Sequence, residues 1–250
     1  VYSSADMVNW TDHGAIRVAG SNGAAKWASN SWAPAACHKT INGKEKFFLY
    51  FADNGSGIGV LEADSPTGPW RDPIGKQIIS RETPGCSGSE IGWLFDPAVL
   101  VDDDGTGYLY FGGIGNTAGK PDDFIKNPKC GRVVKLADDM VSLAGDPVTI
   151  DAPYMFEDSG INKIGDKYYY SYCTNWTNVS GRDETIPAAN IAVMESDNPM
   201  TGFKFVGCVL KNPGTYFGAS GNNHHCFAEF KGTWYAFYHT KKDTLALGTK

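Results

Sequence analysis

A repeat of about 60 residues runs through this 250-residue chain, and it restricts the possible folds more than any other feature. Each copy contains a glycine turn followed by an aromatic segment, and the equivalent residues Tyr50, Tyr110 and Tyr170 are 60 residues apart. Turns such as Asp104-Gly105 accept positive φ and are typical of β-hairpins. A long period of this kind indicates a repeat architecture such as a solenoid or a propeller.

Each repeat predicts strands rather than helices. An apolar strand, a hairpin, an aromatic strand, a third strand and an exit segment describe a four-stranded antiparallel sheet, and such sheets around an axis form a β-propeller. We therefore predict an all-β, five-bladed β-propeller, with residues 1–250 as a single catalytic domain. Blades two, three and four are expected at 30–75, 94–150 and 154–210. The first and last blades are expected to be incomplete in this chain, lacking the inner strands of the first and the outer strands of the last.

Composition excludes several classes of protein. The net charge is −6 and the pI about 5.3, which argues against a nucleic-acid partner because such partners need a basic surface. No run of 18 apolar residues is present, so no membrane-spanning helix is expected. Six scattered cysteines resemble neither a zinc site nor a disulfide framework. They are expected to be free thiols, and one or two disulfides are the alternative. The sequence leaves open whether the protein is secreted or cytoplasmic.

Three ionisable residues occupy nearly the same place in successive repeats. An aromatic strand begins twelve residues after Asp96 and eleven residues after both Glu157 and His224. In a propeller the first strand of each blade lines the central channel, so these side chains should meet near one mouth. Two carboxyl groups in a channel can perform acid–base chemistry on a glycosidic bond. The alternative is that they are channel carboxylates that bind water or a cation.

Four motifs, in the order of the chain, resemble glycoside hydrolase family 43, and the resemblance extends over nearly all of the sequence. It implies a five-bladed propeller of the α-L-arabinofuranosidase / β-xylosidase type. Such an enzyme is exo-acting and releases arabinofuranose and/or xylose from plant hemicellulose with inversion. The motifs are Trp32-Ala33-Pro34, Phe95-Asp96-Pro97-Ala98-Val99, Phe156-Glu157 and Asn222-Asn223-His224-His225.

The resemblance also implies a role for individual residues. Glu157 would be the general acid, and Asp96 the third carboxylate, which orients the acid and helps it to keep its proton. The family's general base is an Asp on the inner strand of the first blade; no residue of this chain takes that place, and Asp6 is expected to be a surface turn residue. His224 would be the channel histidine, which contacts calcium in many members. A histidine that only binds channel water is the alternative.

Aromatic residues near the predicted mouth are candidates for substrate binding because an apolar ring stacks well on the C–H face of a sugar. The candidates are Trp32, Phe95, Phe156 and Trp176, and packing between blades is the alternative for each. The expected partner is a hemicellulose-derived oligosaccharide, together with a companion fragment or longer precursor that completes blades one and five. A non-catalytic carbohydrate-binding propeller and an endo-arabinanase are the competing functions.

Overall fold

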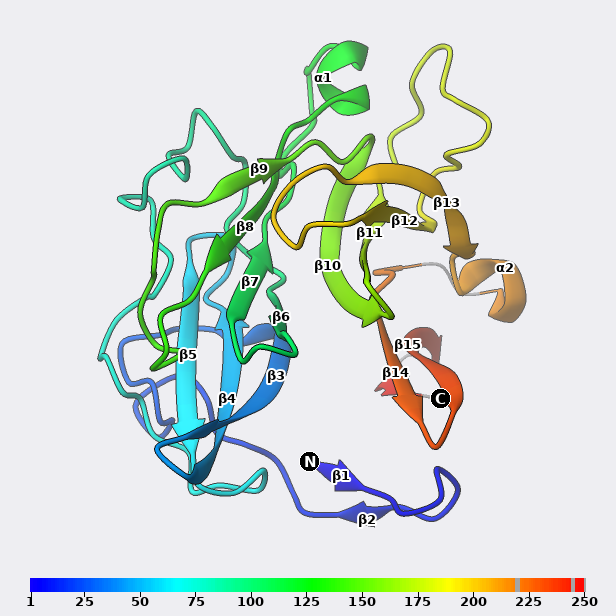
Figure 1. Cartoon of the computed structure of the whole chain (residues 1–250). Helices are drawn as coiled ribbons and strands as arrows, with labels where there is room; N and C mark the ends of the chain where they lie inside the picture. Colours follow the sequence, from blue (N-terminus) through cyan, green and yellow to red (C-terminus); the bar gives the residue numbers. More distant parts are fainter. Residues whose placement is uncertain (219–220, 244–245, 250) are drawn as a thin grey trace.

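The chain forms antiparallel sheets that follow one another in sequence order (Figure 1). A computed structural model describes residues 1–218, 221–243 and 246–249. The sheets are β1-β2, β3-β4-β5, β6-β7-β8-β9, β10-β11-β12-β13 and β14-β15-β16. The strands are β1 (Tyr2–Ser3), β2 (Thr11–Asp12), β3 (Trp32–Ile41), β4 (Lys44–Ala52), β5 (Ile58–Ala63), β6 (Ala98–Val101), β7 (Gly107–Phe111), β8 (Gly131–Lys135), β9 (Val148–Ile150), β10 (Met155–Ile164), β11 (Lys167–Thr174), β12 (Ile191–Ser196), β13 (Lys204–Leu210), β14 (His225–Phe230), β15 (Thr233–Asp243) and β16 (Ala246–Thr249).

The all-β prediction is confirmed, since the described residues form only two short helices, α1 (Asp122–Lys126) and α2 (Gly214–Phe217). Within each sheet the strands are neighbours in chain order, as expected for repeated hairpins. The first strands of successive sheets are also neighbours: β3 contacts β6, β6 contacts β10, and β10 contacts β14. The last sheet has a third strand, β16, where the sequence predicted only an inner pair.

The tyrosine repeat explains how neighbouring sheets are joined. Tyr50, Tyr110 and Tyr170 lie on β4, β7 and β11 and are fully buried. The hydroxyl of Tyr50 donates to the carbonyl oxygen of Met140 at 2.6 Å, and that of Tyr110 donates to Pro199, also at 2.6 Å. Each acceptor lies in an acidic turn of the next sheet. The 60-residue spacing therefore places the same tyrosine-to-turn contact at two successive sheet interfaces.

Tyr170 is the centre of an aromatic stack, and its removal should destabilise the protein strongly. Its ring lies 5.9 Å from the ring of Tyr110 and 5.8 Å from that of Tyr172. We expect Tyr170→Ala to lower the free energy of unfolding by about 3–5 kcal/mol because it leaves a cavity between two sheets. Urea unfolding will measure this loss. The matched control is Tyr216→Ala, because this residue is 61% exposed and should change stability by less than about 0.5 kcal/mol; equal losses would contradict the prediction.

The six cysteines are free thiols, as expected, and all of them fall within the described part of the chain. Among the residues described, no helix has the length and apolar character that crossing a membrane requires.

Candidate active site

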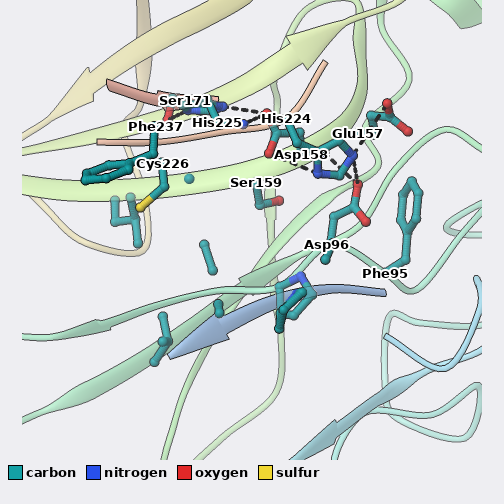
Figure 2. A pocket seen from close by; sticks show the side chains of 18 of the residues that line it. Phe95, Asp96, Glu157, Asp158, Ser159, Ser171, His224, His225, Cys226 and Phe237 are labelled. Atoms are coloured by element: carbon teal, nitrogen blue, oxygen red, sulfur yellow. Dashed lines mark hydrogen bonds and ion pairs between the residues drawn. The ribbon is translucent and has the colours of Figure 1, made fainter. Parts of the chain in front are cut away.

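A cavity of 820 Å³ opens where the first strands of four sheets approach one another. Its lining brings together residues from β3, from the segment before β6, from β10, and from β14 with the segment that precedes it. Asp96, Glu157, Asp158, His224 and His225 are the ionisable residues of this lining that lie close together (Figure 2). Residues that are far apart in sequence therefore form one concave surface with ionisable groups at its wall.

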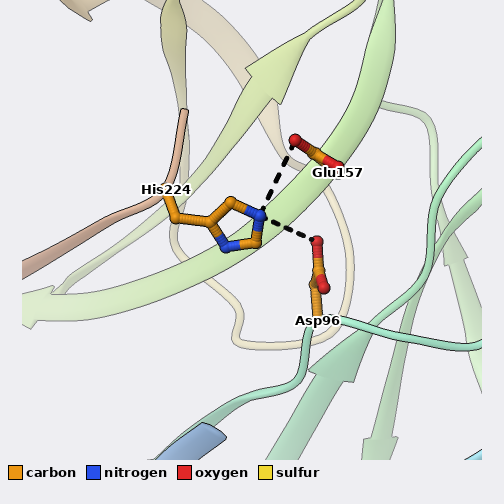
Figure 3. Close-up of side chains that lie close together, drawn as sticks. All are labelled: Asp96, Glu157 and His224. Atoms are coloured by element: carbon orange, nitrogen blue, oxygen red, sulfur yellow. Dashed lines mark ion pairs between the residues drawn. The ribbon is translucent and has the colours of Figure 1, made fainter. Parts of the chain in front are cut away.

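The structure brings together the three residues that share a place in the repeat (Figure 3). The Nε2 atom of His224 lies 3.5 Å from Oδ2 of Asp96 and 3.6 Å from Oε1 of Glu157. Both carboxylate side chains are nearly inaccessible, and 20% of the His224 side chain is exposed. Asn222 donates its side-chain amide to Oε1 of Glu157 at 3.1 Å. One imidazole thus stands between two buried carboxyl groups.

Local backbone irregularities aim these side chains into the cavity. In the pairing of β10 with β11, Glu157 lies opposite Cys173, whereas Gly160 lies opposite Ser171, so β10 carries one extra residue, a β-bulge. Neighbouring residues of a regular strand point to opposite faces. The bulge, together with the positive φ of 66° at Asp158, lets Glu157 and Asp158 both line the cavity. Asp96, just before β6, also has a positive φ, 50°, which is unusual for a non-glycine residue.

The environment of Asp96 favours its protonated form. Burial raises the pKa of its carboxyl group to about 7, and the nearby charges of Glu157 and Asp158 act in the same direction. The charge of His224 and a hydrogen bond from the Asp158 backbone N–H, 2.9 Å from Asp96 Oδ2, oppose this rise. Near neutral pH the cavity can therefore hold a proton on a carboxyl group, which is what general acid chemistry requires.

His224 also favours its protonated form, which for an imidazole is the charged one. Burial disfavours a charged ring, but the carboxylates of Asp158, Glu157 and Asp96 outweigh burial and raise the pKa of His224 to about 10. Burial likewise opposes a charge on Asp158, yet the neighbouring His225 and His224 rings hold the pKa of the Asp158 carboxyl below its ordinary value. At neutral pH the cavity wall therefore contains an imidazolium facing a buried, ionised Asp158.

These shifts predict that stability falls at alkaline pH. A pKa of His224 raised from 6.5 to about 10 contributes stability that is complete below pH 6.5 and is lost as pH rises towards 10. We expect the thermal unfolding midpoint to decrease between pH 7 and pH 9, and this decrease to be smaller in His224→Gln, whose side chain does not titrate. Calorimetry of both proteins across this range measures the difference. An identical pH dependence in the variant would contradict the assignment.

The aromatic candidates divide into two groups. Trp32 and Phe95 line the cavity, as does Trp93, whose ring meets that of Phe95 edge-on at 5.1 Å. Phe156 packs partly buried against the core, because it neighbours Glu157 on β10 and points the other way. Trp176 follows β11 and is not among the lining residues. The structure therefore unites only the first two predicted aromatic residues with the carboxyl groups.

Three further polar residues belong to the site but were not among the predicted site residues. Asp158 contacts His224, Asn222 contacts Glu157, and His225 contacts Asp158. Asn222 and His225 flank His224 within one short motif, which was a usable signal. Asp158 had no such signal, since the residue after Glu157 in a regular strand should face away from the cavity. Asp6, by contrast, is an exposed turn residue that accepts hydrogen bonds from the backbone of Val8 and Asn9, as expected.

Asp96, Glu157 and His224 also form a compact set of donor atoms, all within 4.8 Å of one another. Calcium takes six to eight oxygen ligands. Here the third donor is a ring whose two nitrogens both lie against carboxylates, with Nδ1 3.4 Å from Asp158 Oδ1. The set does not fit calcium while the ring keeps its protons. The calcium contact of His224 stays a prediction.

Comparison with known proteins gives a consistent result. The family model described as "Glycosyl hydrolases family 43" matches residues 1–249. The chain is 58% identical over 247 residues to an arabinoxylan arabinofuranohydrolase of Paenibacillus polymyxa, covering 96% of this chain and 38% of the relative. It is 56% identical over 254 residues to a protein of the same name from Bacillus subtilis (strain 168), covering 99% of this chain and 49% of the relative. The chain thus spans about half or less of these relatives.

Solved structures agree with this match. A Bacillus subtilis arabinoxylan arabinofuranohydrolase of family 43, solved with cellotetraose, superposes with a TM-score of 0.92 at 55% identity, covering 96% of this chain and 50% of that one. An α-L-arabinofuranosidase of Clostridium thermocellum gives 0.76 at 40% identity, covering 96% and 70%. A β-xylosidase/α-arabinofuranosidase from a compost metagenome, solved with xylotriose in a calcium-free form, gives 0.63 at 28% identity, covering 92% and 70%.

Proposed function

Because the chain belongs to glycosyl hydrolase family 43, we propose that it is the catalytic domain of an exo-acting glycosidase that inverts the anomeric centre. The bonds cleaved are those that join arabinofuranose, and in some substrates xylose, to hemicellulose. The names of the two curated relatives favour arabinoxylan as the polymer. The observation that carries the proposal is the juxtaposition of Asp96, Glu157 and His224 in an open cavity.

We also propose that the five sheets are blades of one propeller. Support comes from the successive contacts of β3, β6, β10 and β14, and from the tyrosine contact repeated between sheets. In this arrangement the cavity is the mouth of the central channel. Strands that complete the first and last blades would come from the rest of the protein or from a companion fragment.

In the proposed reaction Glu157 is the general acid. Its carboxyl group donates a proton to the glycosidic oxygen while the bond from that oxygen to the anomeric carbon breaks. A water molecule attacks the carbon from the opposite face and passes its proton to a general base that lies outside this cluster. Asn222 holds Oε1 of Glu157 from one side and the His224 ring faces it from another. These contacts fix the carboxyl group where it can reach the substrate, and the His224 charge stabilises the carboxylate that remains after proton donation.

Asp96 is not the general base in this proposal. In an inverting enzyme the acid and the base stand about 6.5–9.5 Å apart to leave room for water. The facing oxygen atoms of Asp96 and Glu157 lie within 4.8 Å of each other, which is too close. Asp96 instead lies beside the acid, either as a carboxylate or sharing a proton with it. One proton therefore stays on this pair of carboxyl groups near neutral pH. We assign no base, since the remaining carboxylate of the cluster, Asp158, is engaged by two histidines.

Sugar binding is proposed for the exposed aromatic rings of the cavity. Trp32 is 42% exposed and Trp93 is 38% exposed, and the buried Phe95 supports Trp93. Flat, partly exposed rings beside carboxylates match the alternation of C–H faces and hydroxyl groups on a sugar. Phe156 and Trp176 are left out of the proposed binding surface because their side chains do not line the cavity.

The proposal is tested with the whole gene product and defined arabinoxylan oligosaccharides. We expect release of single arabinose units, identified by chromatography, with xylose release from xylo-oligosaccharides as the second activity. Proton NMR during the first minutes should show the product with the anomeric configuration opposite to that of the substrate. Initial retention of configuration, or release of oligosaccharides only, would contradict an exo-acting inverting enzyme.

A further inference from the structure

We propose that Asp158 is a positioning residue of the active site, which fixes the His224 ring between Asp96 and Glu157 and so sets the rate of the chemical step. The proposal rests on the function proposed above. It differs from the roles given to the other carboxyl groups, because Asp158 acts through the histidine and not on the sugar.

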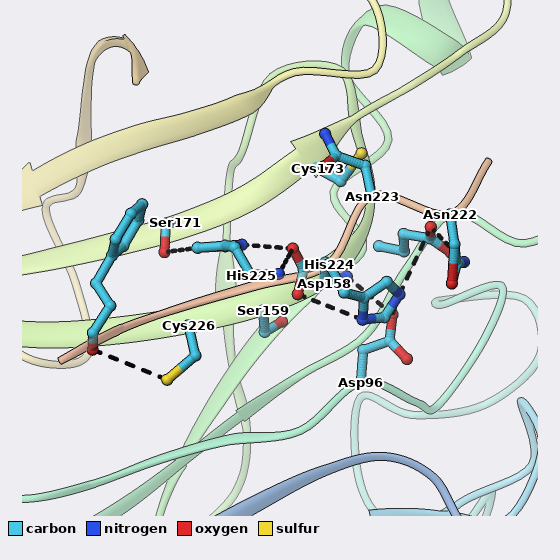
Figure 4. A network of polar contacts seen from close by, with 12 residues as sticks. Asp96, Asp158, Ser159, Ser171, Cys173, Asn222, Asn223, His224, His225 and Cys226 are labelled. Atoms are coloured by element: carbon cyan, nitrogen blue, oxygen red, sulfur yellow. Dashed lines mark hydrogen bonds and ion pairs between the residues drawn. The ribbon is translucent and has the colours of Figure 1, made fainter. Parts of the chain in front are cut away.

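The side chain of Asp158 holds both histidines of the Asn-Asn-His-His segment (Figure 4). Its Oδ1 atom lies 3.4 Å from Nδ1 of His224. Its Oδ2 atom accepts hydrogen bonds from the backbone N–H of His225 at 3.1 Å and from Nδ1 of the same residue at 2.5 Å. One carboxylate therefore determines the position of the segment and the direction of the His224 ring.

Because Nδ1 of His224 is turned towards Asp158, Nε2 on the far side of the ring is turned towards Asp96 and Glu157. Without the charge of Asp158 the orientation of the His224 ring would no longer be fixed. Nε2 would then no longer face both carboxyl groups at 3.5–3.6 Å.

The backbone of Asp158 makes a second connection to the catalytic pair. Its N–H donates to Oδ2 of Asp96 at 2.9 Å. This direction of the N–H depends on the bulge and on the positive φ of Asp158, a conformation that costs free energy in a non-glycine residue. Asp158 therefore contacts Asp96 with its backbone N–H and His224 with its side chain. This is the geometry expected of a residue that positions both groups.

The outer end of this network is also fixed. The His225 side chain is fully buried, and its Nε2 atom lies 2.7 Å from the hydroxyl oxygen of Ser171 on β11. Gly160 makes room for this contact, because a Cβ atom there would press on the Ser171 hydroxyl and lie 3.0 Å from Nε2 of His225. The order of contacts is therefore Ser171, His225, Asp158, His224 and then the catalytic pair.

The test is Asp158→Asn in the whole gene product, a substitution that keeps the shape and the backbone N–H but removes the charge. We expect kcat on arabinose-releasing substrates to fall about 10–100-fold, the size that misplacement of a catalytic group causes, while KM stays within about threefold. The matched control is Asp102→Asn: the Asp102 side chain is 9% exposed and binds Lys163 and Tyr168 outside the residues that line the cavity. It should lose comparable stability and keep kcat.

Two kinetic outcomes would overturn the inference: a kcat of Asp158→Asn within threefold of wild type, or a rise in KM at constant kcat. A crystal structure of the variant gives a second measure that does not depend on activity. We expect Nε2 of His224 to lie beyond 4 Å from at least one of the two carboxyl groups, and an unmoved ring overturns the inference.

If wild type releases no sugar, the proposed function fails, and the position of the ring still decides the role of Asp158. If Asp158→Asn does not fold, Ser171→Ala replaces it with the same two measurements and a smaller expected loss of kcat.

Discussion

Glu157→Gln should reduce kcat on arabinoxylan oligosaccharides about 10³-fold, within the range that a positioned general acid contributes. The amide cannot donate a carboxylic proton to the leaving oxygen, yet it keeps the size of the side chain and an oxygen atom that accepts the hydrogen bond from Asn222. The fold and the cavity should therefore be preserved. Steady-state kinetics will give the loss, and calorimetry should find the dissociation constant for the product sugar unchanged within a few-fold.

The leaving group provides the sharper control for this variant. A dinitrophenyl glycoside departs as a stable anion and needs no proton, so Glu157→Gln should lose much less activity on it than on the natural linkage. If both substrates lose activity equally, Glu157 does not act as the general acid. If neither loses activity, the catalytic assignment of this cavity is wrong.

Asp96→Asn should have the second largest effect, a fall in kcat/KM of about 10²-fold at pH 7. In the wild-type protein the His224 charge is shared between Asp96 and Glu157, at 3.5 and 3.6 Å. An amide at position 96 cannot share a proton with Glu157 and leaves the imidazolium facing the Glu157 carboxyl group alone. The proton that the reaction needs would then be absent from the acid.

The measurement is kcat/KM for wild type and Asp96→Asn from pH 5 to pH 9. Because the pKa of Asp96 is raised to about 7 by burial, the variant should also lose the wild-type inflection near that pH. Asp6→Asn is the matched control, since Asp6 is an exposed turn residue and its change should leave the profile unaltered. A profile for Asp96→Asn that coincides with wild type would remove Asp96 from the mechanism.

Much of the site was accessible from the sequence because its residues follow the repeat. Asp96, Glu157 and His224 stand eleven or twelve residues before an aromatic strand, and hairpins of similar length convert this similar spacing into similar positions on neighbouring sheets. Trp32 and Phe95, which were expected near the mouth, line the cavity. Phe156 does not, because the alternation of side chains along β10 turns its ring into the core.

The sequence by itself determined the all-β architecture, the order of the sheets and the three ionisable residues that meet, because hairpin turns and strand periodicity are local properties. Only the tertiary structure decided that Asp158 faces the same cavity as Glu157 and that its carboxylate turns His224 towards the pair. The physical reason is that the orientation of the Asp158 backbone N–H and of the His225 ring depends on contacts between residues 50 or more positions apart in the sequence. No spacing within a single repeat records such contacts.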